Sequence, residues 1–198
     1  MTDKANESRR NFLYLAAGGL GGVAAAATAI PFVGSMFPAA DTLAASKTEF
    51  DVTTVAPGQQ VVILWQGKPV FVVHRTPELL KEVLGHDDML KDKDSKAIPE
   101  VSQPWMNDEN RAYRSIKPEY LVSSAVCTHL GCIPGFKPTA GRKDWGDSVP
   151  ADWPGGWHCP CHGSKYDISG RVINGSPAPF NLHALPYKYK DDSVIVIG

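Results

Sequence analysis

CTHLGC at residues 127–132 and CPCHGS at residues 159–164 are the two stretches that decide the fold of this chain. They contain all four of its cysteines, and each also contributes one histidine, His129 in the first box and His162 in the second. Two thiolates and two imidazoles can bind either Zn²⁺ or a [2Fe–2S] centre in which two histidines replace two cysteines on one iron. Each box carries one cysteine more than such a site needs. The role of that extra pair therefore decides between the two kinds of metal centre.

The composition sets the frame for these boxes. A chain of 198 residues with 43% hydrophobic content allows one globular domain of ordinary size plus an additional segment. Its 20 basic and 21 acidic side chains nearly cancel, which gives no indication of a nucleic-acid partner. The 18 glycines and 16 prolines favour a domain rich in turns and strands over a helical bundle.

The N-terminal region is typical of a membrane anchor. Residues 1–10 are polar, and residues 11–40 contain no charged side chain, which is ample for a span of about 20 apolar residues. We predict a cytoplasmic segment at 1–10 and a transmembrane anchor at 11–37. A signal peptide that is cleaved near residues 43–45 is the alternative.

The first residues also indicate how the chain is exported. SRRNFL at residues 8–13 resembles a twin-arginine export signal, which carries proteins that fold before they cross the membrane. Lys4, Arg9 and Arg10 keep the N-terminus cytoplasmic, so we expect the rest of the chain on the far side of a bacterial cytoplasmic membrane, in the periplasm.

The remainder of the chain is predicted to be a tether followed by a β domain. Small and polar residues at 38–58 indicate a flexible tether, and 59–198 is predicted to be the folded domain. Hydrophobic runs and turn residues predict strands, a short helix opened by Thr76 and Pro77, and a charged surface insertion. The predicted ranges are strands at 61–65, 69–73, 120–126, 187–190 and 194–197, the helix at 77–84 and the insertion at 86–112.

Two simpler roles for the cysteines have to be weighed. Four cysteines facing an oxidising compartment can form two disulfides, but this leaves His129 and His162 unexplained. A structural zinc site normally uses closely matched cysteine pairs. Here His129 lies two residues after Cys127, His162 lies three after Cys159, and two cysteines are left over. Both alternatives explain the boxes less well than an iron–sulfur centre.

The two boxes closely resemble those of the Rieske iron–sulfur proteins of quinol-oxidising cytochrome bc complexes. The resemblance continues through Tyr166 and through GSPAP at residues 175–179, which is similar to the proline loop of that family. It implies an all-β, Rieske-type antiparallel domain with a short helix and loop insertion, carried on a single N-terminal transmembrane helix. The implied cluster-binding loops are 127–132 and 159–166, and the residues that match the proline loop are Gly175, Pro177, Ala178 and Pro179.

The same resemblance implies one Rieske-type [2Fe–2S] cluster and its ligands. Cys127 and Cys159 bind one iron as thiolates, and His129 and His162 bind the other through imidazole nitrogens. Cys132 and Cys161 form a disulfide between the two loops. Such a bond suits an oxidising compartment.

The resemblance also implies two hydrogen bonds to the cluster, from residues at matching positions. Ser164 is expected to donate to a bridging sulfide and Tyr166 to the sulfur of Cys127. Neutral imidazoles and such hydrogen bonds both stabilise the reduced state, and Rieske potentials reach about −150 to +300 mV against roughly −400 mV for plant-type ferredoxins. We therefore expect a high-potential centre.

The function implied by the family is electron transfer in a ubiquinol–cytochrome c oxidoreductase, the cytochrome bc1 complex. His162, together with His129, is the expected catalytic group, because it meets the quinol in a pocket on cytochrome b. Leu130 and Gly131 lie at that docking surface. The electron then passes to a c-type cytochrome, cytochrome c1, with coupled release of protons. One tip serves two partners, so the tether is expected to let the domain swing.

Other functions remain open at this stage. The chain could be the Rieske small subunit of an exported periplasmic oxidoreductase such as arsenite oxidase. A soluble ferredoxin or a ring-hydroxylating oxygenase component is disfavoured by the second cysteine in each box and by the export signal. The stretch between the boxes, 133–158, is longer than in compact members of the family, and its Trp145 and Trp153 are either interface anchors or loop packing. None of the other four histidines is assigned a metal, namely His74, His86, His158 and His183.

Overall fold

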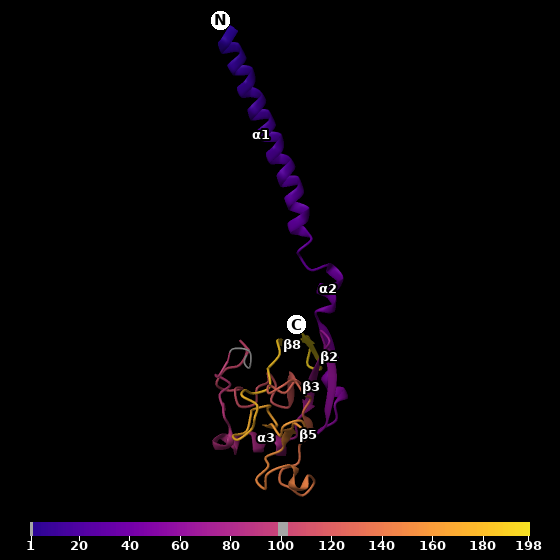
Figure 1. Ribbon diagram of the computed structural model, residues 1–198. Coiled ribbons are helices and arrows are strands. Elements are labelled where there is room, and N and C mark those ends of the chain that lie inside the picture. Colours follow the sequence, from indigo (N-terminus) through magenta and orange to yellow (C-terminus); the bar gives the residue numbers. More distant parts are fainter. Residues whose placement is uncertain (1, 99–102) are drawn as a thin grey trace. The chain divides into compact units, whose positions relative to one another are not determined.

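The computed structural model describes residues 2–98 and 103–198, and within these the side chains of residues 2–5 and 45 are not described. Residue 1 of the predicted cytoplasmic segment, the side chain of Lys4 and residues 99–102 of the predicted insertion therefore lie outside the description. The chain divides into two compact units, Met1–Ala44 and Ala45–Gly198 (Figure 1).

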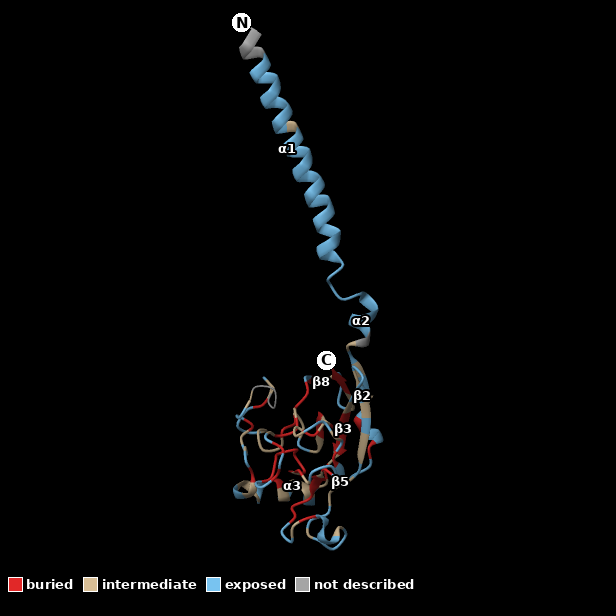
Figure 2. Ribbon diagram, viewed as in Figure 1, coloured by how far each residue is buried: buried red, intermediate tan, exposed pale blue. Residues whose placement is uncertain are grey.

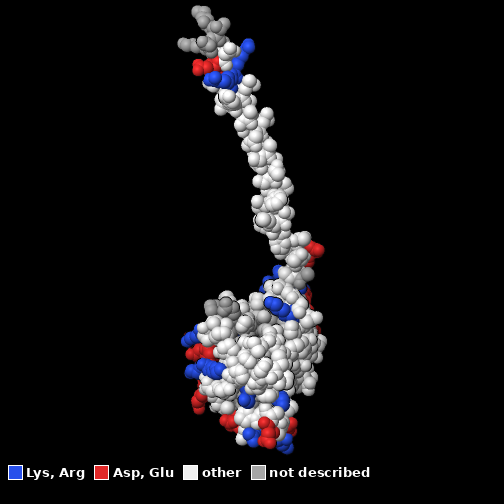
Figure 3. All heavy atoms as spheres, viewed as in Figure 1, with Lys and Arg blue, Asp and Glu red and all other residues white. Residues whose placement is uncertain are grey.

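The first unit is dominated by the helix α1, Thr2–Gly34. It begins inside the polar segment, so Arg9 and Arg10 are helical, and Pro31 lies in its last turn. The part Asn6–Gly34 is long and apolar enough to cross a membrane. Its side chains are exposed almost throughout (Figure 2), and its charged residues gather at the N-terminal end (Figure 3). These features fit a membrane anchor, because lipid rather than protein would cover the apolar surface.

The prediction of a flexible tether is wrong for residues 48–58. This range contains the strand β1, Thr48–Asp51, which pairs antiparallel with β9, Val194–Ile197. Val52 and Val55, just after β1, are almost fully buried. The error has a physical cause: β1 is only four residues long and its partner is at the other end of the chain, so no local pattern reveals the pairing. The short helix α2, Ala40–Ala45, occupies much of the remaining tether range.

Nine short strands in the described part of the second unit form three antiparallel sheets of three strands each. The orders are β1-β9-β8, β2-β3-β4 and β5-β6-β7. This confirms the predicted antiparallel β domain. The strands not yet given bounds are β2 Gln60–Trp65, β3 Lys68–His74, β4 Tyr120–Ser124, β5 Gly135–Lys137, β6 Gly156–His158, β7 Lys165–Asp167 and β8 Tyr187–Tyr189.

The central strand β3 joins two hydrophobic cores. Side chains alternate between the two faces of a strand, and in β3 both faces are buried. Val70 and Val72 pack into a core shared with β1, β8 and β9. Phe71 and Val73 pack into a second core, in which the rings of Phe71 and Trp157 stack with centroids 5.3 Å apart. This second core contains Cys127 and Cys159, so it supports the cluster loops from below.

Two local predictions are confirmed. The hairpin of β2 and β3 closes through Gln66 and Gly67, which both have positive φ, as a two-residue turn of this kind requires. The helix α3, Pro77–Leu84, starts where the hydroxyl oxygen of Thr76 accepts a hydrogen bond from the backbone N–H of Leu79, and it ends at Gly85. The remaining short helices are 3₁₀ turns: η1 Val52–Thr54, η2 Asp87–Met89 and η4 Gly146–Ser148.

A buried group of arginines fixes the turn that follows β7. Arg75, Arg114 and Arg171 are each about 1% exposed. Arg171 donates from Nε to the buried Asp167 at 2.7 Å, while Arg75 donates to the Ser169 hydroxyl at 2.9 Å. Burial lowers the pKa of Arg75 and of Arg114 to about 10, which leaves both charged at neutral pH. The turn that succeeds Tyr166 is thus held by charge-assisted hydrogen bonds.

Candidate metal centre

The two cluster loops are built on the same backbone plan. In the first, the Cys127 N–H donates to the Cys132 carbonyl at 2.8 Å and the Gly131 N–H to the Cys127 carbonyl at 3.0 Å. In the second, the Cys159 N–H donates to the Ser164 carbonyl at 2.7 Å and the Gly163 N–H to the Cys159 carbonyl at 3.0 Å. Gly131 and Gly163 both have positive φ, a conformation that glycine adopts without strain. The first cysteine and the histidine of each loop are therefore held by the same pattern of backbone hydrogen bonds.

A disulfide between Cys132 and Cys161 joins the loops. This is the pairing implied by the sequence resemblance, and it is confirmed. It also rules out the alternative of two disulfides, because Cys127 and Cys159 are free thiols, both buried. One thiol from each loop is thereby left for a metal.

The structure brings the four expected ligands to one place. The rings of His129 and His162 lie edge to face with centroids 4.8 Å apart, at the end of the domain formed by the two loops. The buried thiols of Cys127 and Cys159 interact with each other, and each accepts a hydrogen bond from the backbone of its own loop's histidine. Two free thiols and two adjacent imidazoles, one of each from each loop, match the donor set of a Rieske-type [2Fe–2S] cluster. The residues present fit that cofactor.

The environment of the two thiols is not symmetric. Burial opposes ionisation of Cys127, but hydrogen bonds from the Tyr166 hydroxyl and the His129 backbone outweigh burial and lower the pKa of this thiol. For Cys159, burial is the largest influence and raises the pKa of its thiol. Both thiols accept backbone hydrogen bonds, but Cys127 also accepts side-chain bonds from Tyr166 and Ser164, which stabilise the anionic form that binds iron.

Tyr166 is fully buried and its hydroxyl lies 3.2 Å from the Cys127 sulfur. The same hydroxyl accepts a bond from the Thr128 N–H at 3.1 Å. Thr128 in turn donates from Oγ1 to the Phe180 carbonyl at 2.6 Å. Burial, and next the contact with Cys127, raise the pKa of Tyr166, so it stays a hydrogen-bond donor. Sequence reasoning missed Thr128, and its place between a cysteine and a histidine ligand was the available signal.

Ser164 is also fully buried, and its Oγ accepts a bond from the backbone N–H of Ala178 at 3.1 Å. Ala178 belongs to the proline loop, residues 175–179, so this loop packs against the second cluster loop. Ser176 reinforces the contact, because its Oγ accepts from the Lys165 N–H at 3.0 Å. The proline loop thus lies beside the second cluster loop.

The tip is exposed at its histidines and apolar around them. His162 is exposed and His129 partly so, while the side chains of Leu130 and Ile133 are 70% and 53% exposed. Such an apolar rim on a soluble domain indicates a contact surface. Leu130 and Gly131 therefore lie in a position from which they can meet a partner. Ile133 was not singled out from the sequence.

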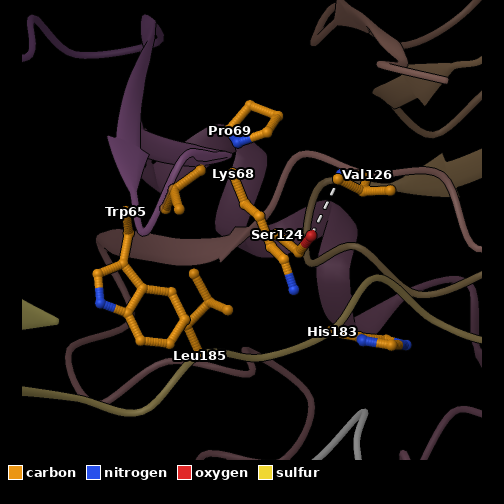
Figure 4. Close-up of a pocket in the computed structure, with 8 residues that line it drawn as sticks. Trp65, Lys68, Pro69, Ser124, Val126, His183 and Leu185 are labelled. Carbon is orange, nitrogen blue, oxygen red and sulfur yellow. Dashed lines mark hydrogen bonds between the residues drawn. The ribbon is translucent and has the colours of Figure 1, made fainter. Parts of the chain in front are cut away.

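A pocket lies beside the base of the first cluster loop (Figure 4). It measures about 380 Å³ and is lined by β2, β3, β4 and the segment that carries His183 and Leu185. Ser124 accepts the Val126 N–H in its wall at 3.2 Å. Neither His129 nor His162 lines this pocket. The imidazoles lie outside this pocket, with His162 exposed and His129 partly exposed.

The long stretch between the boxes packs onto its own domain. Trp153 is buried with Leu90, Val149 and Ile173, and its indole N–H donates to the Lys137 carbonyl at 3.0 Å. Trp145 is partly exposed and also bonded within the loop. Loop packing rather than an interface therefore accounts for Trp153.

Comparisons with known proteins agree with this site. Residues 82–186 match the family model "Rieske [2Fe-2S] domain", and residues 1–39 match "Ubiquitinol-cytochrome C reductase Fe-S subunit TAT signal". The ubiquinol–cytochrome c reductase iron–sulfur subunit of Allochromatium vinosum is 43% identical over 98% of this chain and 89% of the relative. That of Rhodospirillum rubrum is 42% identical over 100% and 95%. The chain belongs to the Rieske iron–sulfur subunits of ubiquinol–cytochrome c reductase.

A solved structure supports the same family. A subunit chain of "Hyperthermophilic respiratory Complex III" matches 91% of this chain and 97% of its own length, with 25% identity and a TM-score of 0.51. As a Rieske subunit, the chain is an electron-transfer component of an oxidoreductase and carries one [2Fe–2S] cluster. Its signal and apolar helix make it a single-pass membrane protein with an exported Rieske domain. Nothing in these comparisons supports an arsenite oxidase subunit.

Proposed function

We propose that this chain oxidises quinol at a cytochrome b subunit and passes the electron to a c-type cytochrome, cytochrome c1. Cys127 and Cys159 would hold one iron of the cluster, and His129 and His162 would hold the other. The observation that carries the proposal is the pair of imidazoles, with ring centroids 4.8 Å apart and His162 exposed, together with one buried free thiol in each of the same two loops. When bound, the cluster supplies a site that takes up one electron at a time.

The chain's own residues add the proton chemistry. With one ring nitrogen of the exposed His162 given to the metal, the other would be left to accept a hydrogen bond from a quinol hydroxyl. This nitrogen would take the quinol proton while the cluster takes the electron, because negative charge gained nearby would favour the protonated imidazole. His129 offers a second such nitrogen. Leu130 and Gly131 form the surface that seats the tip on cytochrome b and excludes water from the contact.

The two predicted hydrogen bonds to the cluster test the proposal. Ser164→Ala and Tyr166→Phe each remove a donor that stabilises the reduced state, so we expect each to lower the midpoint potential. A bond to a charged group contributes about 1.5–3 kcal/mol and about 1.4 kcal/mol equals 59 mV for one electron, which predicts shifts of roughly 60–130 mV. Redox titration of the reduced-state EPR signal measures them. Unchanged potentials in both variants would refute these roles.

We further propose that residues 38–47 let the Rieske domain move between its two partners. This range ends at residue 47, and not at residue 58 as in the predicted tether, because β1 begins at Thr48 and belongs to the folded domain. Prolines inserted in 38–47 should slow quinol–cytochrome c reductase turnover and leave the midpoint potential unchanged, because the cluster environment is not altered. Steady-state assays of membranes and redox titration check both parts. Full turnover in the stiffened variant would count against the movement.

A further inference from the structure

The segment after α3 carries a lysine that is bonded to the proline loop. Lys91 donates from its backbone N–H to the Val172 carbonyl at 3.0 Å. Its Nζ donates to the Ser176 carbonyl at 2.6 Å and to the Ala178 carbonyl at 2.9 Å. One ammonium group therefore bridges two carbonyls on either side of Pro177.

The sequence of the proline loop makes these two carbonyls important. They belong to the peptide groups that precede Pro177 and Pro179, and a peptide group that precedes proline has no N–H. Only the carbonyl oxygen of each group can be held by a hydrogen bond. Lys91 binds both of them.

The peptide group between the two is the one that contacts Ser164. Its N–H is that of Ala178, and it donates to the Ser164 Oγ at 3.1 Å. Since this bond occupies one lone pair of the hydroxyl oxygen, the hydroxyl proton is directed elsewhere. Neighbouring contacts hold the ends of the loop: the Asn174 N–H donates to the Met89 carbonyl at 2.7 Å, and the Asn181 side chain to the Asp92 carbonyl at 2.8 Å.

We propose that Lys91 is a positioning residue: by holding the two carbonyls around Pro177, it keeps the Ala178 N–H on Ser164 and so aims the Ser164 hydroxyl at the cluster. The proposal rests on the function proposed above, in which Ser164 donates to the cluster. Lys91 reaches the centre through the loop and Ser164 rather than by touching the cluster.

A set of variants in the intact membrane complex tests this role. Lys91→Met removes the donors and the charge but keeps the length of the side chain, and because Lys91 is exposed it leaves no buried cavity. Lys91→Arg keeps charge and donors, and Lys91→Gln keeps a neutral donor. Lys93→Met is the matched control, since Lys93 is in the same segment and forms an exposed ion pair with Asp87 at 3.7 Å.

The readout is the midpoint potential of the cluster, from redox titration of its EPR signal. We expect Lys91→Met to lower the potential by part of the shift seen in Ser164→Ala, Lys91→Arg to restore it, and Lys93→Met to leave it unchanged. Lys91→Gln should lie between Lys91→Met and the unaltered protein. In the Ser164→Ala background, Lys91→Met should add no further shift, because the group through which it acts is gone.

The outcomes separate the possible failures. An unchanged potential in Lys91→Met, with a shift in Ser164→Ala, overturns the role of Lys91 and leaves the proposed function intact. The role of Lys91 is also overturned if Lys91→Met shifts the midpoint potential equally in the unaltered protein and in the Ser164→Ala background. Such a result would show that the charge of Lys91 acts on the cluster directly and not through Ser164. No shift in Ser164→Ala overturns the proposed bond of Ser164 and the inference that rests on it.

Discussion

His162→Ala and Cys127→Ala should each yield a chain without its [2Fe–2S] cluster and without quinol–cytochrome c reductase activity above background. Each variant removes one of the four donors, and an iron that loses a protein ligand is no longer enclosed by the two loops. The reduced-state EPR signal and the iron content of the purified protein measure the loss.

His158→Ala is the matched control for this prediction. His158 directly precedes the second box, ends β6 and is only partly buried, so its removal takes away an imidazole without touching the proposed ligand set. We expect this variant to keep the cluster and its activity. A His162→Ala protein that retained the EPR signal, or a His158→Ala protein that lost it, would show that the ligands are assigned wrongly.

Gly156→Ala should prevent the second cluster loop from forming. Gly156 begins β6 with φ +141°, a conformation that residues with a side chain rarely adopt. A Cβ at this position would overlap the carbonyl oxygen of Tyr166 and the backbone of Asp167. Since Gly156 pairs with Asp167 across the sheet, the overlap forces β6 and β7 apart. We expect a loss of stability above about 4 kcal/mol and, with it, loss of the cluster.

The control is Gly141→Ala in the same stretch between the boxes. Gly141 also has positive φ, at +75°, but a Cβ there meets nothing within 4 Å. Backbone strain alone costs about 1–2 kcal/mol, which the domain should tolerate. Thermal unfolding followed by circular dichroism, together with cluster content, compares the two. Equal losses in both variants would mean that strain rather than the close approach of β7 governs Gly156.

Much of the fold could be predicted where the deciding interactions are local. The hairpin of β2 and β3 and the capped helix α3 depend on turn and cap residues only a few positions apart, so their sequence patterns are sufficient. The strand β1 was missed because its four residues gain their stability from β9, at the far end of the chain. The buried arginines were missed for a related reason: their acceptors are mostly backbone carbonyls and hydroxyls, which no charge pattern reveals.

The sequence by itself determined the chemistry of the centre. Thiolates and imidazoles are distinctive metal ligands, and their spacing within each box is local, so the ligand candidates and the membrane anchor follow from residue identities. The resemblance of the two boxes to the Rieske family then implies the type of cluster. Only the tertiary structure decided what surrounds that chemistry. It placed Thr128 on the Tyr166 hydroxyl, Lys91 on the proline loop, and Trp153 in the domain rather than at an interface. These partners are separated by tens of residues along the chain, and they meet only because the sheets bring their strands together.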